Sequence, residues 1–206
     1  MHWKTAGFIV LLFALSPFVL AQKNEVSLSV GALATSDQQA FACFINIPTC
    51  NGPFNIHFST TVALEGDYVR QVFNFRLASV GAEFPILGVP SQEVTTTFNG
   101  FIATAHQSSV FFTPSARIKF LPSGSISPFL SLGGGLAHHN AARPGTRGAL
   151  QFGGGVDFKT PLPHLGIRAE LRDFWAKGLE ESTSVTRVSP ERQHNLFGGV
   201  GFVIKF

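Results

Sequence analysis

The feature of this sequence that most constrains its fold is the alternation in residues 195–206, which read NLFGGVGFVIKF. One parity carries Leu196, Gly198, Val200, Phe202, Ile204 and Phe206, and the other carries Phe197, Gly199, Gly201, Val203 and Lys205. Because a strand points alternate residues to opposite faces, one face is apolar and the other is small and ends in a charge. This alternation and length are typical of a strand that crosses a bilayer as part of a barrel.

The N-terminus has the pattern of an export signal. Lys4 supplies a positive region, residues 6–20 form an apolar run, and Val19 and Ala21 are small residues at the −3 and −1 positions of a cleavage site. We expect a signal peptide over residues 1–21, cleaved after Ala21, and one mature domain over residues 22–206. The apolar run is short for a membrane helix, so an uncleaved anchor is the less favoured alternative.

The composition suits a sheet that exposes one face to lipid. The chain has 21 Gly and 22 Phe, and only 13% of its residues are charged, whereas an average soluble domain has about 25% charged residues. The formal net charge of +3 is small, and the basic residues are scattered rather than gathered in a patch. These features argue against nucleic-acid binding.

Alternation divides the mature chain into about eight strands, with short turns alternating with longer polar loops. We expect the strands at residues 25–33, 54–58, 62–70, 109–120, 125–137, 148–159, 165–175 and 195–206. The connection over residues 71–107 is more apolar than a solvated loop. Since Phe73, Phe75 and Leu77 still alternate, we expect its flanking strands to continue as an extracellular hairpin; a binding element or lid is the alternative.

The C-terminal residues Val200, Phe202, Ile204 and Phe206 resemble the sorting signal of Gram-negative outer-membrane barrels. The whole pattern resembles the small eight-stranded outer-membrane β-barrel superfamily, the OmpA/OmpX-like fold, without a C-terminal peptidoglycan-binding domain. This resemblance implies an all-β, transmembrane, antiparallel up-and-down barrel in the bacterial outer membrane, with both termini periplasmic. It also implies Sec-type export, handling by the barrel-assembly machinery, and contact with outer-membrane lipid and lipopolysaccharide.

Charged residues recur on the inward parity of these strands. At about eight strands the bore of a barrel is just filled by side chains, so opposite charges there are expected to pair. We therefore predict a salt-bridged network in the lumen; a proton or ion path is the alternative. Its members are Glu25, Glu65, Asp67, Arg117, Lys119, Asp157, Lys159, Arg168, Glu170, Arg172 and Lys205.

The predicted outer loops carry further candidates. Cys43 and Cys50 are the only cysteines and are expected to form a loop disulfide in an exported chain. Arginine and lysine residues suit lipopolysaccharide phosphates, although interleaved glutamates make a plain solvated surface an equal explanation. These basic residues are Arg143, Arg147, Lys177, Arg187 and Arg192. The expected interfacial aromatic girdle comprises Tyr68, Phe120, Phe174, Trp175 and Phe206.

Catalytic chemistry has one weak candidate, the run His138-His139-Asn140. A lipid A deacylase or acyltransferase would need a serine and an orienting carboxylate beside it, for which Ser182 and Glu180 or Glu181 are the nearest residues on the neighbouring loop. We expect no metal, because adjacent strand residues point apart, and no cofactor.

The sequence therefore favours a non-catalytic structural or surface-interaction role through long outer loops, with an extracellular ligand as the partner. The alternatives are a lipid A-modifying enzyme, a narrow ion channel, and a soluble lipocalin-like barrel. Small-residue faces that carry charge argue against the lipocalin.

Overall fold

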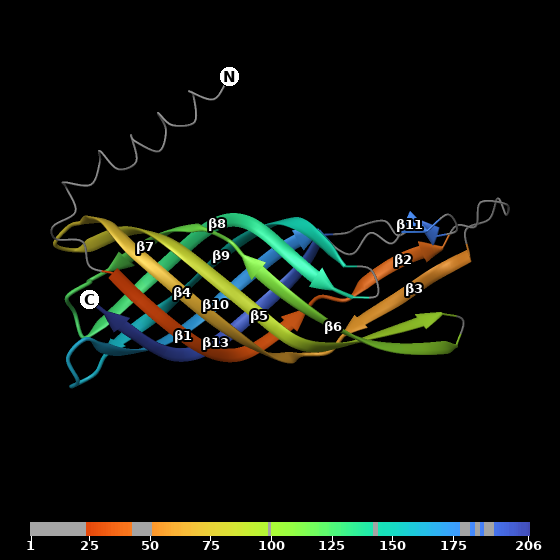
Figure 1. The fold of residues 1–206 in the computed structure, drawn as a ribbon, viewed down its shortest axis with the longest axis horizontal. Coiled ribbons are helices and arrows are strands. Elements are labelled where there is room, and N and C mark those ends of the chain that lie inside the picture. The colour runs from red at the N-terminus through yellow and green to blue at the C-terminus, as the bar shows by residue number, and fades with distance from the viewer. Residues whose placement is uncertain are drawn as a thin grey trace, which may run out of the picture.

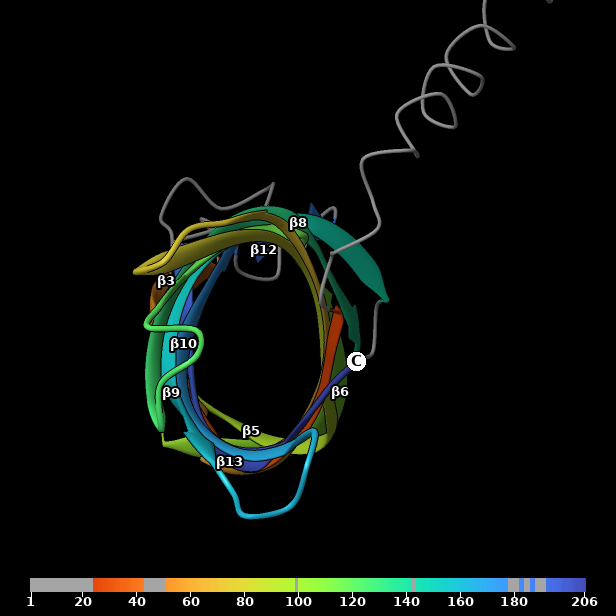
Figure 2. The same cartoon turned by 90° about the vertical axis from the view of Figure 1, so that its left-hand side faces the viewer.

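The protein is an elongated antiparallel β-barrel, shown in the computed structural model from the side in Figure 1 and along its axis in Figure 2. The structure describes residues 24–42, 51–98, 100–141, 144–177, 182–183, 186–187 and 192–206. The signal peptide predicted over residues 1–21 and the cysteines Cys43 and Cys50 lie outside these residues.

The ring has eight positions, each filled by one strand or, in one case, by two consecutive strands; each position is called a stave. The staves are β1 (Asn24–Thr35), β4 (Thr61–Asn74), β5 (Ala78–Phe98), β6 (Phe101–Phe112) continued by β7 (Ser115–Phe120), β8 (Ile126–Asn140), β9 (Gly145–Lys159), β10 (Leu165–Lys177) and β13 (Arg192–Lys205). Pairing of β1 with β13 closes it, with Val30 opposite Val200. Asn24 N donates to Phe206 O at 2.7 Å. The end of the barrel where Asn24 and Phe206 lie is called the proximal end below, and the opposite end the distal end.

No helix in the described part of the chain is long and apolar enough to cross a membrane.

Side chains alternate around the whole ring as the sequence predicts. The exposed rows include Leu28, Leu132 and Phe202, with exposed fractions of 66%, 68% and 61%, whereas the intervening positions are buried in the bore. Large apolar residues therefore cover the outside and polar residues fill much of the inside. This is the reverse of a soluble lipocalin-like barrel, so the predicted fold class is confirmed.

The predicted number of strands is correct, but the membership of one strand is wrong. The segment predicted over residues 54–58 belongs to β3 (Asn51–Phe58), which pairs with β2 (Gln38–Ala42) and the distal part of β5 rather than forming a stave. The missing stave is β5, which lies inside the connection predicted over residues 71–107. It pairs with β4 after a short turn at residues 75–77 and returns along the whole barrel.

Beyond the distal end, β2, β3 and the distal parts of β5 and β6 form a four-stranded extension (Figure 1). The register of β5 against β6 shifts between Val89 and Gln92, around Pro90. On the barrel side of this bulge β5 pairs with β4, and beyond it β5 pairs with β3. A bulge bends a strand, which allows β5 to leave the ring and support the extension.

The loop predicted over residues 138–147 is shorter than expected, because β8 continues to Asn140 and β9 begins at Gly145. The loop predicted over residues 176–192 contains two short paired strands, β11 (Ser182–Thr183) and β12 (Thr186–Arg187). Longer strands thus replace part of each predicted distal loop.

The stave formed by β6 and β7 is interrupted at Thr113 and Pro114. Proline has no N–H to donate to the ladder. The carbonyl oxygen of Pro114 still accepts a hydrogen bond from Gly134 N of β8 at 3.1 Å. The neighbouring strand approaches closely, because a Cβ at Gly135 would collide with the carbonyl oxygen of Phe112. Glycine at this position is therefore required for β8 to pack against the interrupted stave.

Candidate functional site

The proximal half of the bore contains a charged layer supplied by six staves. Its carboxylates are Glu25, Glu65, Asp67, Glu83, Asp157 and Glu170, and its cationic groups are Arg117, Lys119, Arg168 and Arg172. Each of these residues is at most 6% exposed. They meet because they occupy the inward parity of neighbouring strands at similar heights.

One half of this layer is centred on Arg168. Its Nε donates to Asp157 Oδ1 at 2.8 Å, and its Nη1 donates to Asp67 Oδ2 at 2.9 Å and to Ser27 Oγ at 2.8 Å. The ammonium group of Lys119 contacts Asp157 Oδ2 at 2.6 Å and Glu25 Oε1 at 2.6 Å. Several of these contacts join staves that are not neighbours in the ring, such as β10 with β4 and β7 with β1.

The other half is centred on Arg172, which is surrounded by carboxylates. Its guanidinium lies 3.0 Å from Glu65 Oε1, 2.7 Å from Glu83 Oε1 and 2.9 Å from Glu170 Oε2. Arg117 donates to Asp67 Oδ2 at 2.9 Å and also to Glu83 Oε1. Arg117 and Arg172 therefore share Glu83.

The structure changes the charge balance expected from the sequence. Nine of the eleven predicted lumen residues lie in the layer, but Lys159 is exposed at the proximal end of β9 and Lys205 is only half-buried at the end of β13. Glu83 is a member that sequence analysis missed, because its strand was assigned to a connection. The alternation of Val80, Ala82 and Phe84 around it is the signal that could have revealed it. Six carboxylates thus face four cationic groups.

An apolar septum lies on the distal side of the charged layer. Each of the eight staves contributes to it, and the exposed fraction of its members is 4% or less. Its residues are Leu33, Ala63, Leu87, Val89, Phe111, Ala137, Ala149, Phe174, Ala176 and Phe197. The rings of Phe111 and Phe174 lie 5.2 Å apart between centroids. The septum combines large side chains with four alanines, and a mixture of large and small residues is how a narrow barrel fills its interior. Phe174 belongs to this septum and not to the predicted interfacial girdle, because it has the inward parity of β10.

A third, uncharged polar layer follows the septum at the distal end. Gln92 Nε2 donates to Thr35 Oγ1 at 2.9 Å, and Gln107 Nε2 donates to Gln92 Oε1 at 3.3 Å. Ser109 Oγ lies 2.8 Å from His139 Nδ1, and His139 is 4% exposed. The bore is thus charged, apolar and polar in succession.

The predicted catalytic constellation is not brought together in the described residues. His138 points outward and hydrogen-bonds Thr146 at 2.9 Å, and Glu180 and Glu181 lie outside the described residues. The partner of His139 is Ser109, a pair that sequence analysis missed because the two residues are 30 positions apart. Within the described residues no carboxylate orients this imidazole, as a Ser-His-acid triad requires. No group of three or more His, Cys, Asp or Glu in the same residues could hold a metal ion.

Comparison with solved structures assigns the architecture. The outer membrane protein OprG from Pseudomonas aeruginosa matches over 90% of this chain and 96% of its own, with a TM-score of 0.64 and 12% sequence identity. The fold is that of a small outer-membrane β-barrel. Neisserial surface protein A matches over 88% of this chain and 97% of its own at 12% identity, with a TM-score of 0.43. The outer membrane enzyme PagL matches over 87% and 98% at 16% identity, with a TM-score of 0.44. No protein-family model and no curated protein matches the chain.

The exterior of this outer-membrane barrel fold carries polar and aromatic groups at both ends of its apolar rows. At the distal end, His194 Nδ1 lies 2.6 Å from Asp173 Oδ2 and its ring stacks on Trp175 at 5.8 Å. At the proximal end, Tyr68 OH donates to Asn24 Oδ1 at 3.0 Å and its ring stacks on Phe84 at 6.2 Å. Phe120 and Phe206 are exposed at the same end. Aromatic groups therefore flank the apolar exterior on both sides.

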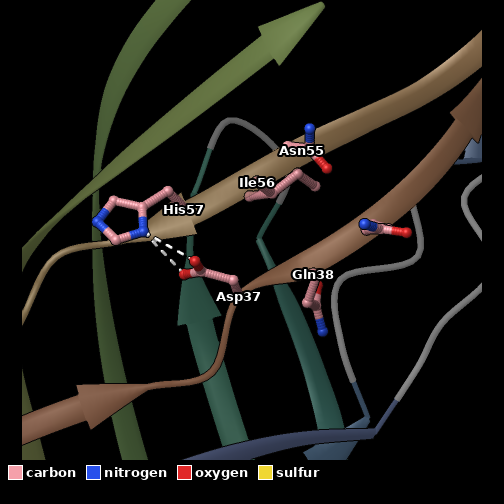
Figure 3. A pocket seen from close by; sticks show the side chains of 6 residues that line it. Asp37, Gln38, Asn55, Ile56 and His57 are labelled. Atoms are coloured by element: carbon pink, nitrogen blue, oxygen red, sulfur yellow. Dashed lines mark hydrogen bonds and ion pairs between the residues drawn. The ribbon is translucent and has the colours of Figure 1, made fainter.

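The extension of the barrel holds a shallow pocket of about 270 Å³, shown in Figure 3. His57 Nδ1 lies 2.9 Å from Asp37 Oδ1, which also accepts a hydrogen bond from Phe58 N at 3.2 Å. The hydrogen bond from His57 holds the pKa of Asp37 below its ordinary value. The pocket is otherwise lined by Gln38, Gln39, Asn55 and Ile56. The contact between Asp37 and His57 links the start of β2 to the end of β3.

Proposed function

We propose that this protein is a non-catalytic integral protein of the bacterial outer membrane, exported by the segment 1–21, with a sealed bore and an extension that acts at the cell surface. The carrying observation is the apolar exterior, which surrounds the ring and is bounded by aromatic groups at both ends. Exposing so much apolar surface to water would be unfavourable, so a lipid environment is expected around the ring.

The height of the apolar exterior matches a membrane. On β8 the outward row is apolar from Ile126 to Leu136 and becomes polar at His138, and on β13 it is apolar from Phe206 to Leu196 and becomes polar at His194. Ten residues at about 3.3 Å each, tilted by about 40°, span about 25 Å. This is the height of the lipid-facing band of outer-membrane barrels. The short turns at the proximal end and the extension at the distal end support a periplasmic proximal end and an extracellular distal end.

The bore supports a role without conduction. The septum and the charged layer lie in series, so an ion would have to pass both a dewetted ring and a set of paired charges. The role that remains for the described part of the chain is on its exterior and its extension.

Two measurements test this proposal. Fractionated cells should contain the protein in the outer membrane, and it should migrate differently on a gel before and after boiling, because a folded barrel resists detergent. A purified mature chain that stays monodisperse in water without detergent would contradict membrane insertion. Planar bilayers containing the protein should remain silent, and unit currents altered by Arg117→Met or Glu65→Gln would favour the narrow channel.

A second candidate, lipid A modification, is favoured by one observation, the contact between Ser109 and His139. A serine beside an imidazole is the start of an acyl-transfer site. Purified protein mixed with lipid A would then release fatty acid or transfer an acyl chain, and His139→Ala would abolish the activity. Absence of any turnover removes this candidate.

A further inference from the structure

One edge of the extension is open. Residues 101–107 of β6 pair with β5 on one side, from Phe101 opposite Phe98 to Gln107 opposite Gln92. On the other side, β6 meets β8 only from Ser108 onward. Among the described residues, no strand pairs with this seven-residue edge, and residues 101–106 are exposed on both faces. The edge is visible at the outer side of the β5–β6 hairpin in Figure 1.

This edge lacks the features that normally prevent pairing between strands of different molecules. Natural edge strands are blunted by lysine, proline, bulges or a cover. The free segment reads FIATAHQ and has no charge and no proline, and its ladder with β5 is regular from residue 101 to residue 107. Its large apolar side chains are unusually open, with Phe101 80% and Ile102 70% exposed. The segment is thus suited to accept another strand.

The segment is complementary to a second copy of itself. An antiparallel pair centred on Thr104 uses the whole free edge. This edge starts at Phe101, the first residue of β6, and ends at Gln107, after which β6 pairs with β8. It places Thr104 opposite Thr104 and Ile102 opposite His106, so that no like charges oppose each other. Threonine pairs across antiparallel strands are favourable.

The direction of the strand decides how two copies can meet. The distal part of β6 runs along the barrel axis (Figure 1), so two barrels side by side in one membrane would present parallel edges. Two barrels that face each other from opposing membranes present antiparallel edges, with the tip of each extension beside the root of the other. Antiparallel pairing is the more stable arrangement.

We propose that the free edge of β6 binds the same edge of a second copy of this protein in an opposing membrane, as an antiparallel strand pair centred on Thr104. This inference rests on the proposed insertion in the outer membrane. One strand pair is weak, but many pairs between two surfaces act together. The protein would thus join membranes that both carry it.

The test uses the full mature chain reconstituted in phosphatidylcholine vesicles, with flotation confirming insertion and turbidity reporting clustering. Wild-type vesicles should cluster. Thr104→Lys places two lysines opposite each other and should reduce clustering at least tenfold, whereas a mixture of Thr104→Lys and Thr104→Glu vesicles should restore it. Asn55→Lys adds the same charge to β3, away from the edge, and should cluster like the wild type.

Cross-linking tests the register in a Cys43→Ser/Cys50→Ser background. Thr104→Cys should form an intermolecular disulfide in clustered vesicles, because directly opposite Cα atoms are about 4.5–5.5 Å apart. Phe101→Cys should not, since its two copies would lie about 20 Å apart.

The outcomes separate the two proposals. Protein that fails to float with vesicles refutes membrane insertion. Inserted wild-type protein whose vesicles stay dispersed overturns the strand pairing alone, as does clustering that survives Thr104→Lys. In cells, linkage of Thr104→Cys to a different protein instead of itself would identify a foreign strand and also overturn the pairing.

Discussion

The guanidinium of Arg117 lies over the ring of Phe129, with 4.1 Å between Cζ and the ring centroid. Arg168 approaches the same ring at 4.8 Å. Phe129 is 1% exposed and lies against two cations of the charged layer. Two cations in contact with one buried ring are stabilised by its negative face, which matters in a bore where little water can screen their repulsion.

Replacing Phe129 should therefore destabilise the barrel through more than lost volume. We expect Phe129→Leu to lower the free energy of unfolding by about 1–2 kcal/mol, because the cation–π contacts are lost, and Phe129→Ala by about 3–5 kcal/mol, because a cavity is added. Urea unfolding in detergent micelles measures both. Phe152→Leu on the exterior is the matched control, and an equal loss there would contradict the role of the cations.

The carboxylates of the charged layer should differ in importance. Asp157 contacts two cations, Arg168 and Lys119, so Asp157→Asn should cost about 3–5 kcal/mol by removing one carboxylate partner from each of these buried groups. Glu65 shares Arg172 with Glu83 and Glu170, and its Oε2 has no hydrogen-bond partner in the described residues. Glu65→Gln should therefore cost less than about 1 kcal/mol, because it relieves repulsion. Urea midpoints in micelles compare the two, and equal losses would refute the excess of negative charge.

The septum and the charged layer should seal the bore independently. Phe174→Ala removes the largest contribution of β10 to the septum and should cost about 3–5 kcal/mol in urea unfolding. The charged layer remains, so planar bilayers with this variant should still be silent. Appearance of a conductance after this single change would show that the septum alone closes the bore.

The lipid-facing surface can be distinguished from the water-facing extension with two substitutions at equally exposed positions. Leu132 on the barrel is 68% exposed and Ile102 on the extension is 70% exposed. In phospholipid vesicles, Leu132→Arg should cost about 2–4 kcal/mol, because it places a charge near the middle of the bilayer. Ile102→Arg should cost less than about 0.5 kcal/mol. Equal costs in urea unfolding would contradict the placement of Leu132 in the bilayer and of Ile102 in water.

The attachment of the β2–β3 hairpin should weaken in acid. The pKa of Asp37 is lowered in the folded protein, chiefly by the hydrogen bond with His57. A lowered pKa means that the carboxylate stabilises the fold above the ordinary aspartate range and that this contribution is lost as the pH falls through the folded value. Exchange of the Phe58 amide, corrected for its intrinsic pH dependence, should show more frequent opening below about pH 4. Asp37→Asn should remove this step, and a step that persists in Asp37→Asn would exclude Asp37 as its origin.

Much of the barrel was predictable because strand alternation is a local property. The sequence of β13 shows which residues face outward without any knowledge of its neighbours, and the same reasoning places Arg168 and Arg172 in the bore. The alternation of β5 is less regular, since its outward row includes small residues and Pro85 and Pro90 interrupt the strand. The resulting error in assigning this strand also hid Glu83. The charge balance changed sign because Glu83 joins the layer and because Lys159 and Lys205 lie outside it.

The sequence by itself determined that this chain forms a closed barrel with its apolar rows outside, because a period of two residues over about eight strands leaves few other ways to bury polar groups. Only the tertiary structure decided which side chains share a height in the bore. It placed Phe111, Phe174 and Phe197 in one septum, left Lys159 outside the charged layer, and exposed the edge of β6. Register between distant strands sets these heights, and register depends on the pairing of the whole ring rather than on any one segment.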